Sequence, residues 1–209
     1  MAGYHKYVFD TSARVLVGDF DTMYQQESLE GYDSWHQEDS RWLQRKICLE
    51  IIGAYNFDSI VDIGCAKGSF THILKKRNNK VVGVDISETA LAQARSRYPD
   101  IQFIQADAAE VGVIWNLYDS FQPKGGADLT VCTEILSYVE KWRDLIKVVS
   151  QRSKFFLVCL DIPQNPIGFV KSSEELVAEV ERHFDLIEVI QMKISGFSIV
   201  FGSSLNREL

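Results

Sequence analysis

The sequence has few features that would support a disulfide framework, a zinc site or a membrane span. Its four cysteines, Cys48, Cys65, Cys132 and Cys159, form no C-x-x-C pair and stand in apolar stretches or in a glycine turn. This pattern is typical of reduced, buried thiols in a cytoplasmic protein, and it has no zinc-ligand spacing. No apolar run approaches the roughly 20 residues that a membrane-spanning helix needs. We therefore expect a cytoplasmic protein with neither a bound metal nor a membrane partner.

Positive charge is also in deficit. The chain has 22 lysines and arginines against 29 aspartates and glutamates, which gives a net charge of −7. Non-specific binding to nucleic acid requires a basic face that neutralises phosphates. We therefore expect no nucleic-acid partner.

The length and composition predict a single domain. At 209 residues, 46% of them hydrophobic, the chain can bury one good core. Residues 1–38 are rich in aromatic residues and acids, unlike disordered tails, but they do not alternate as a strand does. We expect them to form a short helical or irregular lid on a core that comprises residues 39–209. Either a monomer or a homodimer is compatible with this organisation.

The most informative stretch connects a short apolar segment to a helix through a glycine turn. Residues Ser59–Ile63 are mostly apolar and β-branched, as expected for a buried parallel strand. Gly64 and Gly68 bracket the turn, where glycine permits unusual backbone angles and the close approach of a ligand. The helix that follows would direct free N–H groups at that ligand. A dinucleotide pyrophosphate, another ligand or no ligand at all remain open from this turn alone.

From residue 59 onward, predicted strands and helices alternate, which indicates a parallel sheet with helices on both faces. The predicted strands span residues 59–63, 80–85, 101–105, 127–133, 155–160, 186–194 and 197–201. Ser195-Gly196 indicates a two-residue hairpin, so the last two strands must be antiparallel to each other.

Capping residues mark the starts of several helices. Asp39 or Ser40 is expected to cap a helix before the first strand, Ser87 a second, and the Ser172-x-x-Glu175 capping box a third. Residues 107–126 carry no such signal and are expected to form a long connection.

Ligands of open α/β sheets bind at the carboxyl ends of the strands, so the residues there are the site candidates. The first strand supplies Asp62 and the glycine turn, and the second ends in Asp85, an acid suited to ribose hydroxyls. The third strand is followed by Asp107 and the fourth by Glu134. Each acid also has a purely structural interpretation, as a helix-flanking acid, a solvated loop acid or a packing residue.

These motifs, in this order, resemble those of the class I S-adenosylmethionine (SAM) methyltransferases. Asp62–Gly68 is similar to their glycine-rich motif I, D-x-G-x-G-x-G, although Ala66 and Lys67 depart from the commoner residues. Glu134–Val139 resembles the "E-V-L-x-x-V" motif of small-molecule methyltransferases, including the nodulation-factor N-methyltransferase type. The resemblance covers about residues 39–201.

The resemblance implies a Rossmann-like, doubly wound α/β sheet of seven strands in the order 3-2-1-4-5-7-6, with the last-but-one strand in space antiparallel. It also implies SAM as the cofactor. The residues that we assign to cofactor binding on this basis are Tyr24, Asp62, Gly64, Cys65, Ala66, Gly68, Asp85, Ile86, Asp107, Ala108 and Thr133.

The implied activity is the transfer of a methyl group to an oxygen or nitrogen of a small molecule, such as a metabolite, a saccharide or a natural-product intermediate. His36, Glu134 and Tyr138 are the catalytic candidates. A general base is needed only if the acceptor must lose a proton, and His36 is then the best single candidate. Two alternatives remain: a non-catalytic SAM- or nucleotide-binding module, and an NAD-dependent oxidoreductase, which would need a tighter glycine fingerprint.

Overall fold

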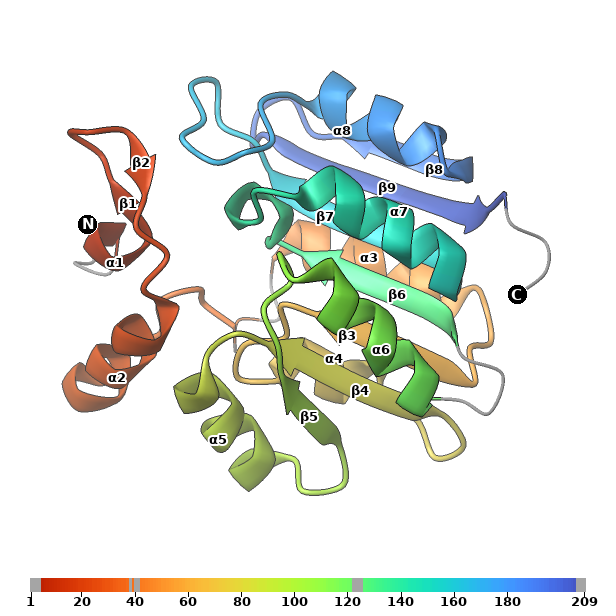
Figure 1. Cartoon of the computed structure of the whole chain (residues 1–209), viewed down its shortest axis with the longest axis horizontal. Coiled ribbons are helices and arrows are strands. Elements are labelled where there is room, and N and C mark those ends of the chain that lie inside the picture. Colours follow the sequence, from red (N-terminus) through yellow and green to blue (C-terminus); the bar gives the residue numbers. More distant parts are fainter. Residues whose placement is uncertain (1–4, 38, 40–41, 122–125, 206–209) are drawn as a thin grey trace.

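The computed structural model describes residues 5–37, 39, 42–121 and 126–205 of the chain. A seven-stranded sheet forms its centre, with helices packed against both faces and the N-terminal segment to one side (Figure 1). The strands of this sheet are β3 (Ser59–Ile63), β4 (Lys80–Asp85), β5 (Gln102–Gln105), β6 (Ala127–Thr133), β7 (Ser153–Asp161), β8 (Phe184–Gln191) and β9 (Phe197–Ser204).

The strand order is β5-β4-β3-β6-β7-β9-β8. The pairs among β3 to β7 are all parallel, whereas β9 runs antiparallel to both of its neighbours, β7 and β8. Counted from β3, this is the order 3-2-1-4-5-7-6. The predicted α/β sheet and its antiparallel last-but-one strand are therefore confirmed.

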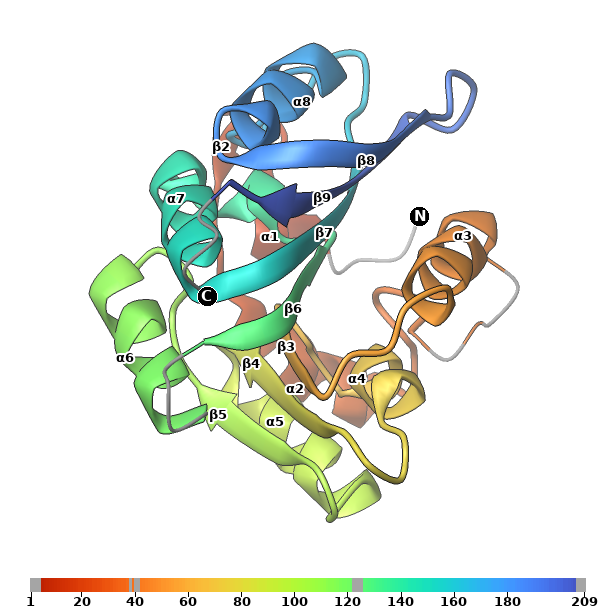
Figure 2. The ribbon, with the colours of Figure 1, turned by 90° about the vertical axis from the view of Figure 1, so that its right-hand side faces the viewer.

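The helices divide between the two faces of the sheet (Figure 2). One face is covered by α6, α7 and α8, which share a buried core with the sheet, and the other by α3 and α4. A smaller cluster packs α5 against β5. The helices are α3 (Leu43–Gly53), α4 (Ser69–Leu74), α5 (Glu88–Arg97), α6 (Val111–Phe121), α7 (Trp142–Arg152) and α8 (Ser173–Glu181), with a short 3-10 helix, η1, at Leu136–Tyr138.

The prediction of a long connection without a helix at residues 107–126 was wrong, because this segment contains helix α6. Ile114 and Tyr118 of this helix are fully buried, and the Tyr118 hydroxyl lies 2.6 Å from Thr130 Oγ1 on β6. A crossover between parallel strands usually contains a helix that packs back on the sheet. Turn residues near position 126 obscured the helical spacing of these apolar side chains in the sequence.

The start of α3 also differs from prediction. The helix begins at Leu43, and the residue before it, Trp42, makes no side-chain capping hydrogen bond. The N-cap residue is therefore Trp42 and not Asp39, and Ser40 lies outside the described residues. The caps expected at Ser87 and Ser172 are both formed, since each side chain accepts a hydrogen bond from the third residue after it.

The final hairpin has a longer loop than predicted. β8 ends at Gln191, and Met192 N donates to Phe197 O at 2.8 Å, which leaves residues 193–196 in the loop. Gly196 has a φ of 81° and its N–H donates to Met192 O. The glycine therefore closes a wider turn, and the two-residue hairpin was wrong.

The N-terminal segment is docked on the core at the side of α5. It contains α1 (His5–Val8), a small hairpin of β1 (Phe9–Asp10) and β2 (Val15–Leu16), and α2 (Phe20–Glu30). The hairpin was not expected from the sequence. Asp21 Oδ1 of α2 accepts hydrogen bonds from Ser87 Oγ (2.8 Å) and Thr89 N (2.9 Å) at the start of α5, and these bonds lower the pKa of Asp21. This carboxylate also complements the positive end of the α5 dipole.

Two general properties follow from the described residues. All four cysteines are buried and free. None of the helices in the described ranges combines the length and the apolar character needed to cross a membrane.

We expect Gly83, in the middle of β4, to be required for packing although β-branched residues favour strands. A Cβ added there would lie 2.6 Å from Phe103 Cδ1 and 2.8 Å from Cys65 Sγ. Gly83→Ala should therefore lower the free energy of unfolding by about 1–3 kcal/mol, measured by urea denaturation. The matched control is Gly112→Ala in α6, where an added Cβ meets nothing within 4 Å and should be neutral or slightly stabilising. A Gly83→Ala protein as stable as wild type would contradict this packing argument.

Candidate functional site

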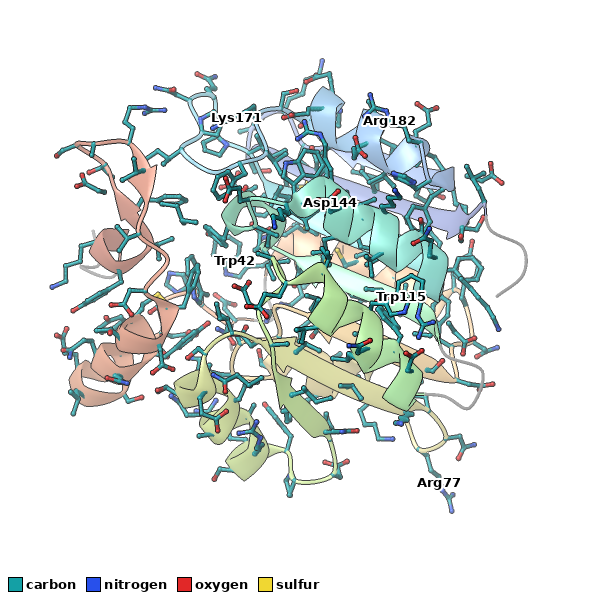
Figure 3. All side chains as sticks on the ribbon, viewed as in Figure 1. Trp42, Arg77, Trp115, Asp144, Lys171 and Arg182 are labelled. Atoms are coloured by element: carbon teal, nitrogen blue, oxygen red, sulfur yellow. The ribbon has the colours of Figure 1, made fainter. Side chains whose placement is uncertain are left out.

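A cavity of about 580 Å³ lies at the carboxyl ends of the parallel strands, between the sheet and the N-terminal segment. In Figure 3, Trp42, one of its lining residues, lies between that segment and the core. All but one of the residues predicted to bind cofactor or act in catalysis line the cavity. They are Tyr24, His36, Asp62, Gly64, Cys65, Ala66, Asp85, Ile86, Asp107, Ala108, Thr133, Glu134 and Tyr138.

The exception is Gly68, which does not line the cavity. Its φ is 77°, and a Cβ there would lie 2.7 Å from Phe103 Cζ. The left-handed backbone and the packed ring both require glycine at this start of α4. Gly64 has a φ of 83° and lines the cavity, and an added Cβ would lie 2.8 Å from Ile135 Cδ1. One glycine thus serves packing alone, and the other serves packing beside the cavity.

Asp85, at the end of β4, organises the turn beside it. Its Oδ2 accepts a hydrogen bond from Ala66 N (2.8 Å) and its Oδ1 one from Ser87 N (2.9 Å). Burial raises the pKa of this carboxyl, and the two backbone N–H groups oppose that rise. Each carboxylate oxygen can accept a further hydrogen bond. Asp85 can therefore hold the turn and a pair of ligand hydroxyls at the same time.

Asp62, at the end of β3, has a carboxylate oxygen that faces no protein donor. Its Oδ2 accepts a hydrogen bond from Thr71 Oγ1 at 2.7 Å, whereas its Oδ1 is buried and has no hydrogen-bond partner among the described residues. Burial raises the pKa of Asp62 to about 6, against the lowering effect of Thr71. A buried acceptor without a donor is costly, so Oδ1 is suited to a donor supplied by a ligand.

Asp107 and Ala108 follow β5 and line the cavity next to Asp85. Asp107 Oδ1 accepts a hydrogen bond from Ala109 N at 2.8 Å, which shapes the loop as an Asx turn. The ends of β6, at Thr133, and of β7, at Asp161, also line the cavity.

Arg45 on α3 was missed by the sequence analysis. Among the described residues that line the cavity it is the sole lysine or arginine. Its guanidinium lies 5.7 Å from the centroid of the Phe70 ring and donates a hydrogen bond to Gln37 O. The sequence signal that could have identified Arg45 is its position on the same helical face as the apolar residues Cys48 and Ile52. This cation is placed to meet an anionic group of a ligand.

Glu134 is the first residue after β6 and has a strained backbone. Its φ of 61° lies in the left-handed region, which costs a non-glycine residue about 1–3 kcal/mol and is concentrated at functional sites. Its Oε2 accepts a hydrogen bond from Asp161 N at 3.0 Å, and Cys159 Sγ lies 3.8 Å from Oε1. Burial raises the pKa of Glu134 to about 8. The strained turn thus holds a carboxyl group with a raised pKa inside the cavity.

Aromatic rings from the N-terminal segment meet Tyr138 above the cavity. The Tyr138 ring lies 5.3 Å from Phe20, 5.7 Å from Phe9 and 6.0 Å from Trp35, measured between centroids. His36 is exposed at the rim and stacks on Trp42 at 6.0 Å. Aromatic side chains of the N-terminal segment therefore pack beside the cavity, where they can exclude water.

Lys67, a departure from the expected motif, fastens the N-terminal segment to the glycine turn. Its buried ammonium lies 2.6 Å from Glu27 Oε1 and 2.9 Å from Asp33 Oδ1. The backbone N–H of Lys67 donates to Gln37 Oε1 at 3.1 Å, and Ser69 Oγ donates to Gln37 O at 2.8 Å. Because its partners are 34 and 40 positions away, no local pattern in the sequence could reveal this role.

Within the described part of the chain, no group of three or more histidine, cysteine, aspartate or glutamate side chains is arranged to hold a metal ion.

We expect Lys67→Met to release the N-terminal segment from the turn. Removing one partner of a buried ion pair leaves the remaining charges uncompensated and typically costs about 3–5 kcal/mol. Hydrogen exchange at residues 20–37 should therefore be faster in the variant, while exchange in β3 stays unchanged. Lys147→Met, at an exposed position of α7, is the matched control. Wild-type exchange at residues 20–37 in Lys67→Met would show that the ion pairs do not hold the segment.

Comparisons with known proteins agree with this geometry. Residues 60–154 match the model of a methyltransferase domain. Trans-aconitate 2-methyltransferase of Afipia carboxidovorans is 33% identical over 104 residues, which are 49% of this chain and 37% of that protein. The enzyme of the same name from Escherichia fergusonii is 29% identical over 113 residues, or 53% of this chain and 41% of that protein. The match thus spans about two-fifths of the length of these relatives.

Solved structures share the fold at low sequence identity. N-methyltransferase NodS of Bradyrhizobium japonicum, in complex with S-adenosyl-L-homocysteine (SAH), has a TM-score of 0.68 at 17% identity, over 88% of this chain and 98% of that one. A SAM-dependent methyltransferase of Mesorhizobium loti has a TM-score of 0.61 at 20% identity, over 77% and 97%. Residues 60–154 are therefore similar to a methyltransferase domain, and the described chain shares the fold of these SAM-dependent methyltransferase structures.

Proposed function

We propose that this protein transfers the methyl group of SAM to an oxygen or nitrogen of a small molecule. The observation that supports this best is that the unpartnered Asp62 Oδ1 and Arg45, the sole lysine or arginine among the described lining residues, lie in one cavity. The methionine portion of SAM carries one ammonium and one carboxylate group. An acid with one unpartnered oxygen and an arginine are the complementary charges for this portion.

The remaining parts of SAM also have matching residues. Asp85 is suited to the two ribose hydroxyls, and Asp107 with Ala108 lies at the next strand end, where the adenine would fit. Ligand cavities usually enclose about 300–1,000 Å³, and this one, at about 580 Å³, falls in that range. The residues present therefore fit the cofactor.

When bound, SAM supplies a methyl group already activated by a sulfonium. The task of the chain is then to orient the acceptor against it, and such alignment contributes roughly 7–11 kcal/mol to lowering a reaction barrier. The aromatic rings around Tyr138 would keep water out. His36, Glu134 and Tyr138 stay the candidates for proton transfer and acceptor binding, with His36 at the rim and Glu134 inside the cavity.

The two alternatives have less support. An NAD-dependent enzyme would use a glycine turn to approach a pyrophosphate, whereas here the Ala66 N–H of that turn is already bonded to Asp85. A non-catalytic module would not require the strained acid at Glu134. The acidic net charge of −7 favours a small acceptor over a nucleic acid. We further propose a cytoplasmic location, consistent with four free, buried cysteines, and either a monomer or a homodimer.

The first test of this function is cofactor binding. Calorimetry should show that the protein binds SAM and SAH, and that NAD gives no comparable signal. Asp85→Ala should weaken SAH binding about ten- to a hundred-fold, because a hydrogen bond to a charged group contributes about 1.5–3 kcal/mol. Asp185→Ala, at an exposed position of β8, is the matched control. NAD binding without a response to SAH would overturn the proposed function.

The second test separates the two ends of the cofactor. 5′-Methylthioadenosine retains the adenosine and sulfur of SAH but lacks the amino-acid portion. Arg45→Ala should therefore lose about ten- to a hundred-fold in affinity for SAH and bind methylthioadenosine as wild type does. The matched control is Arg77→Ala, because Figure 3 shows the Arg77 side chain pointing to solvent. An equal loss of both ligands would mean that Arg45 supports the fold of the cavity rather than the carboxylate.

A further inference from the structure

We propose that the methyl acceptor is an amine and that the Glu134 carboxylate receives its ammonium group, an inference that rests on the proposed methyl transfer. We infer the acceptor class from the charged residues that line the cavity and from the neighbours of Glu134 on the cavity wall.

Glu134 lies at the end of β6, between β3 and β7, on the wall of the cavity. Its neighbours from β7 are Cys159, with Sγ at 3.8 Å, and Asp161, whose N–H donates at 3.0 Å. Cys48 of α3 also lines the cavity and belongs to the same hydrophobic core cluster as Cys159. None of these side chains carries a positive charge, so the protein itself supplies Glu134 with N–H and S–H groups but no counter-ion here.

The wider charge balance points the same way. The acids that line the cavity within the described residues are Asp62, Asp85, Asp107, Glu134 and Asp161, against the single cation Arg45 and the rim residue His36. If Arg45 binds the carboxylate of the cofactor, no lysine or arginine of the described lining is left for an anionic acceptor. With Glu134 ionised, a carboxylate acceptor would then face Glu134 and Asp161 without a partner, which is strongly unfavourable in a partly buried site. An ammonium group would supply the missing positive charge.

The pKa of Glu134 suits the binding of an ammonium group and the uptake of its proton. Burial, with a smaller contribution from the Asp161 charge, raises the pKa of Glu134 to about 8, while the Asp161 N–H and Cys159 oppose the rise. Of the other groups around it, Asp62 has a pKa raised to about 6 by burial, and Arg45 lies on α3. A base whose pKa lies near the working pH is the most effective for proton transfer. Glu134 can therefore bind an ammonium when ionised and take up its proton.

The chemical step balances without another reactant. The acceptor ammonium R–NH₃⁺ gives one proton to the Glu134 carboxylate and becomes R–NH₂. The amine lone pair then forms the new N–C bond to the methyl carbon, the C–S bond breaks, and its electron pair stays on sulfur, which yields SAH. The product is R–NH₂–CH₃⁺, and Glu134 releases its proton to solvent as the product leaves. One proton is therefore released for each methyl group transferred.

The test uses three probes that share one carbon skeleton: benzylamine, benzyl alcohol and benzoate. Calorimetry first establishes SAH binding, and the probes are then titrated into the SAH-saturated protein at pH 8. Benzylamine should bind about ten- to a hundred-fold more tightly than either of the other two. No preference for benzylamine, or tighter binding of benzoate, would overturn the amine assignment. Absence of SAH binding would instead overturn the proposed function.

The role of Glu134 is tested with Glu134→Gln, which keeps an oxygen for the Asp161 N–H but removes the charge. This variant should bind SAH as wild type does and lose the preference for benzylamine. Its weak benzylamine binding should also be insensitive to pH between 6 and about 8, where wild-type affinity rises as Glu134 ionises. Glu140→Gln, an exposed position of the same connection, is the matched control. A retained preference, or a loss of SAH binding, would remove Glu134 from the acceptor site.

Turnover gives an independent readout. The protein is incubated with SAM carrying a ¹³C-labelled methyl group and a small-molecule extract of the source cells. The carbon chemical shift of the labelled product distinguishes an N-methyl group from an O-methyl group or a methyl ester. An N-methyl product supports the proposal, and an O-methyl product or ester overturns it. No labelled product from a protein that binds SAH would count against the proposed methyl transfer itself.

Discussion

The hydrogen bond from Ala66 N to Asp85 Oδ2 is the contact on which the site depends. It joins the turn after β3 to the end of β4, so two strand ends are held in one fixed arrangement. Ala66 has a φ of 49°, a left-handed value that a non-glycine residue adopts only when its surroundings compensate the strain. Here the compensation is a charged acceptor placed at the N–H of the strained residue. The floor of the cavity is therefore formed by the same interaction that shapes the turn.

The opposite side of this turn is fastened by Lys67. A buried ammonium between two carboxylates contributes little net stability, because desolvation opposes the attraction, but it strongly disfavours separation of the partners. The N-terminal segment is thereby coupled to the turn, because displacing α2 would expose the ion pairs and disturb the turn beside the cavity. We propose that the cofactor contacts this same turn.

The electrostatics of the cavity are governed by desolvation. Burial raises the pKa values of Asp62, Asp85 and Glu134 because removal from water disfavours their charged forms. A protein that only needed stability would have replaced such acids with apolar residues at little cost. Their retention in one cavity, with one acid held in a strained backbone, is characteristic of a site that binds positive charge or moves protons. SAM and an ammonium acceptor would each bring a net positive charge, and together they would balance the acids of this cavity.

The sequence by itself determined the sheet, its strand ends and the acids placed there. Buried parallel strands are short, apolar and locally encoded, which is why Ser59–Ile63, Lys80–Asp85 and Ala127–Thr133 were predicted with their observed bounds. Strand ends of a parallel sheet necessarily meet at one edge, so the order of residues along the chain is enough to group Asp62, Asp85 and Glu134 in one site.

Only the tertiary structure decided which of these residues line the cavity and which pack elsewhere. Gly68 and Gly64 look alike in the sequence, and what separates them is the Phe103 ring, which packs over Gly68 alone. Arg45 and Lys67 owe their roles to partners that lie far away in the chain, such as Glu27 and Asp33. Contacts of this kind are set by packing and desolvation across distant segments, and no local spacing of residues records them.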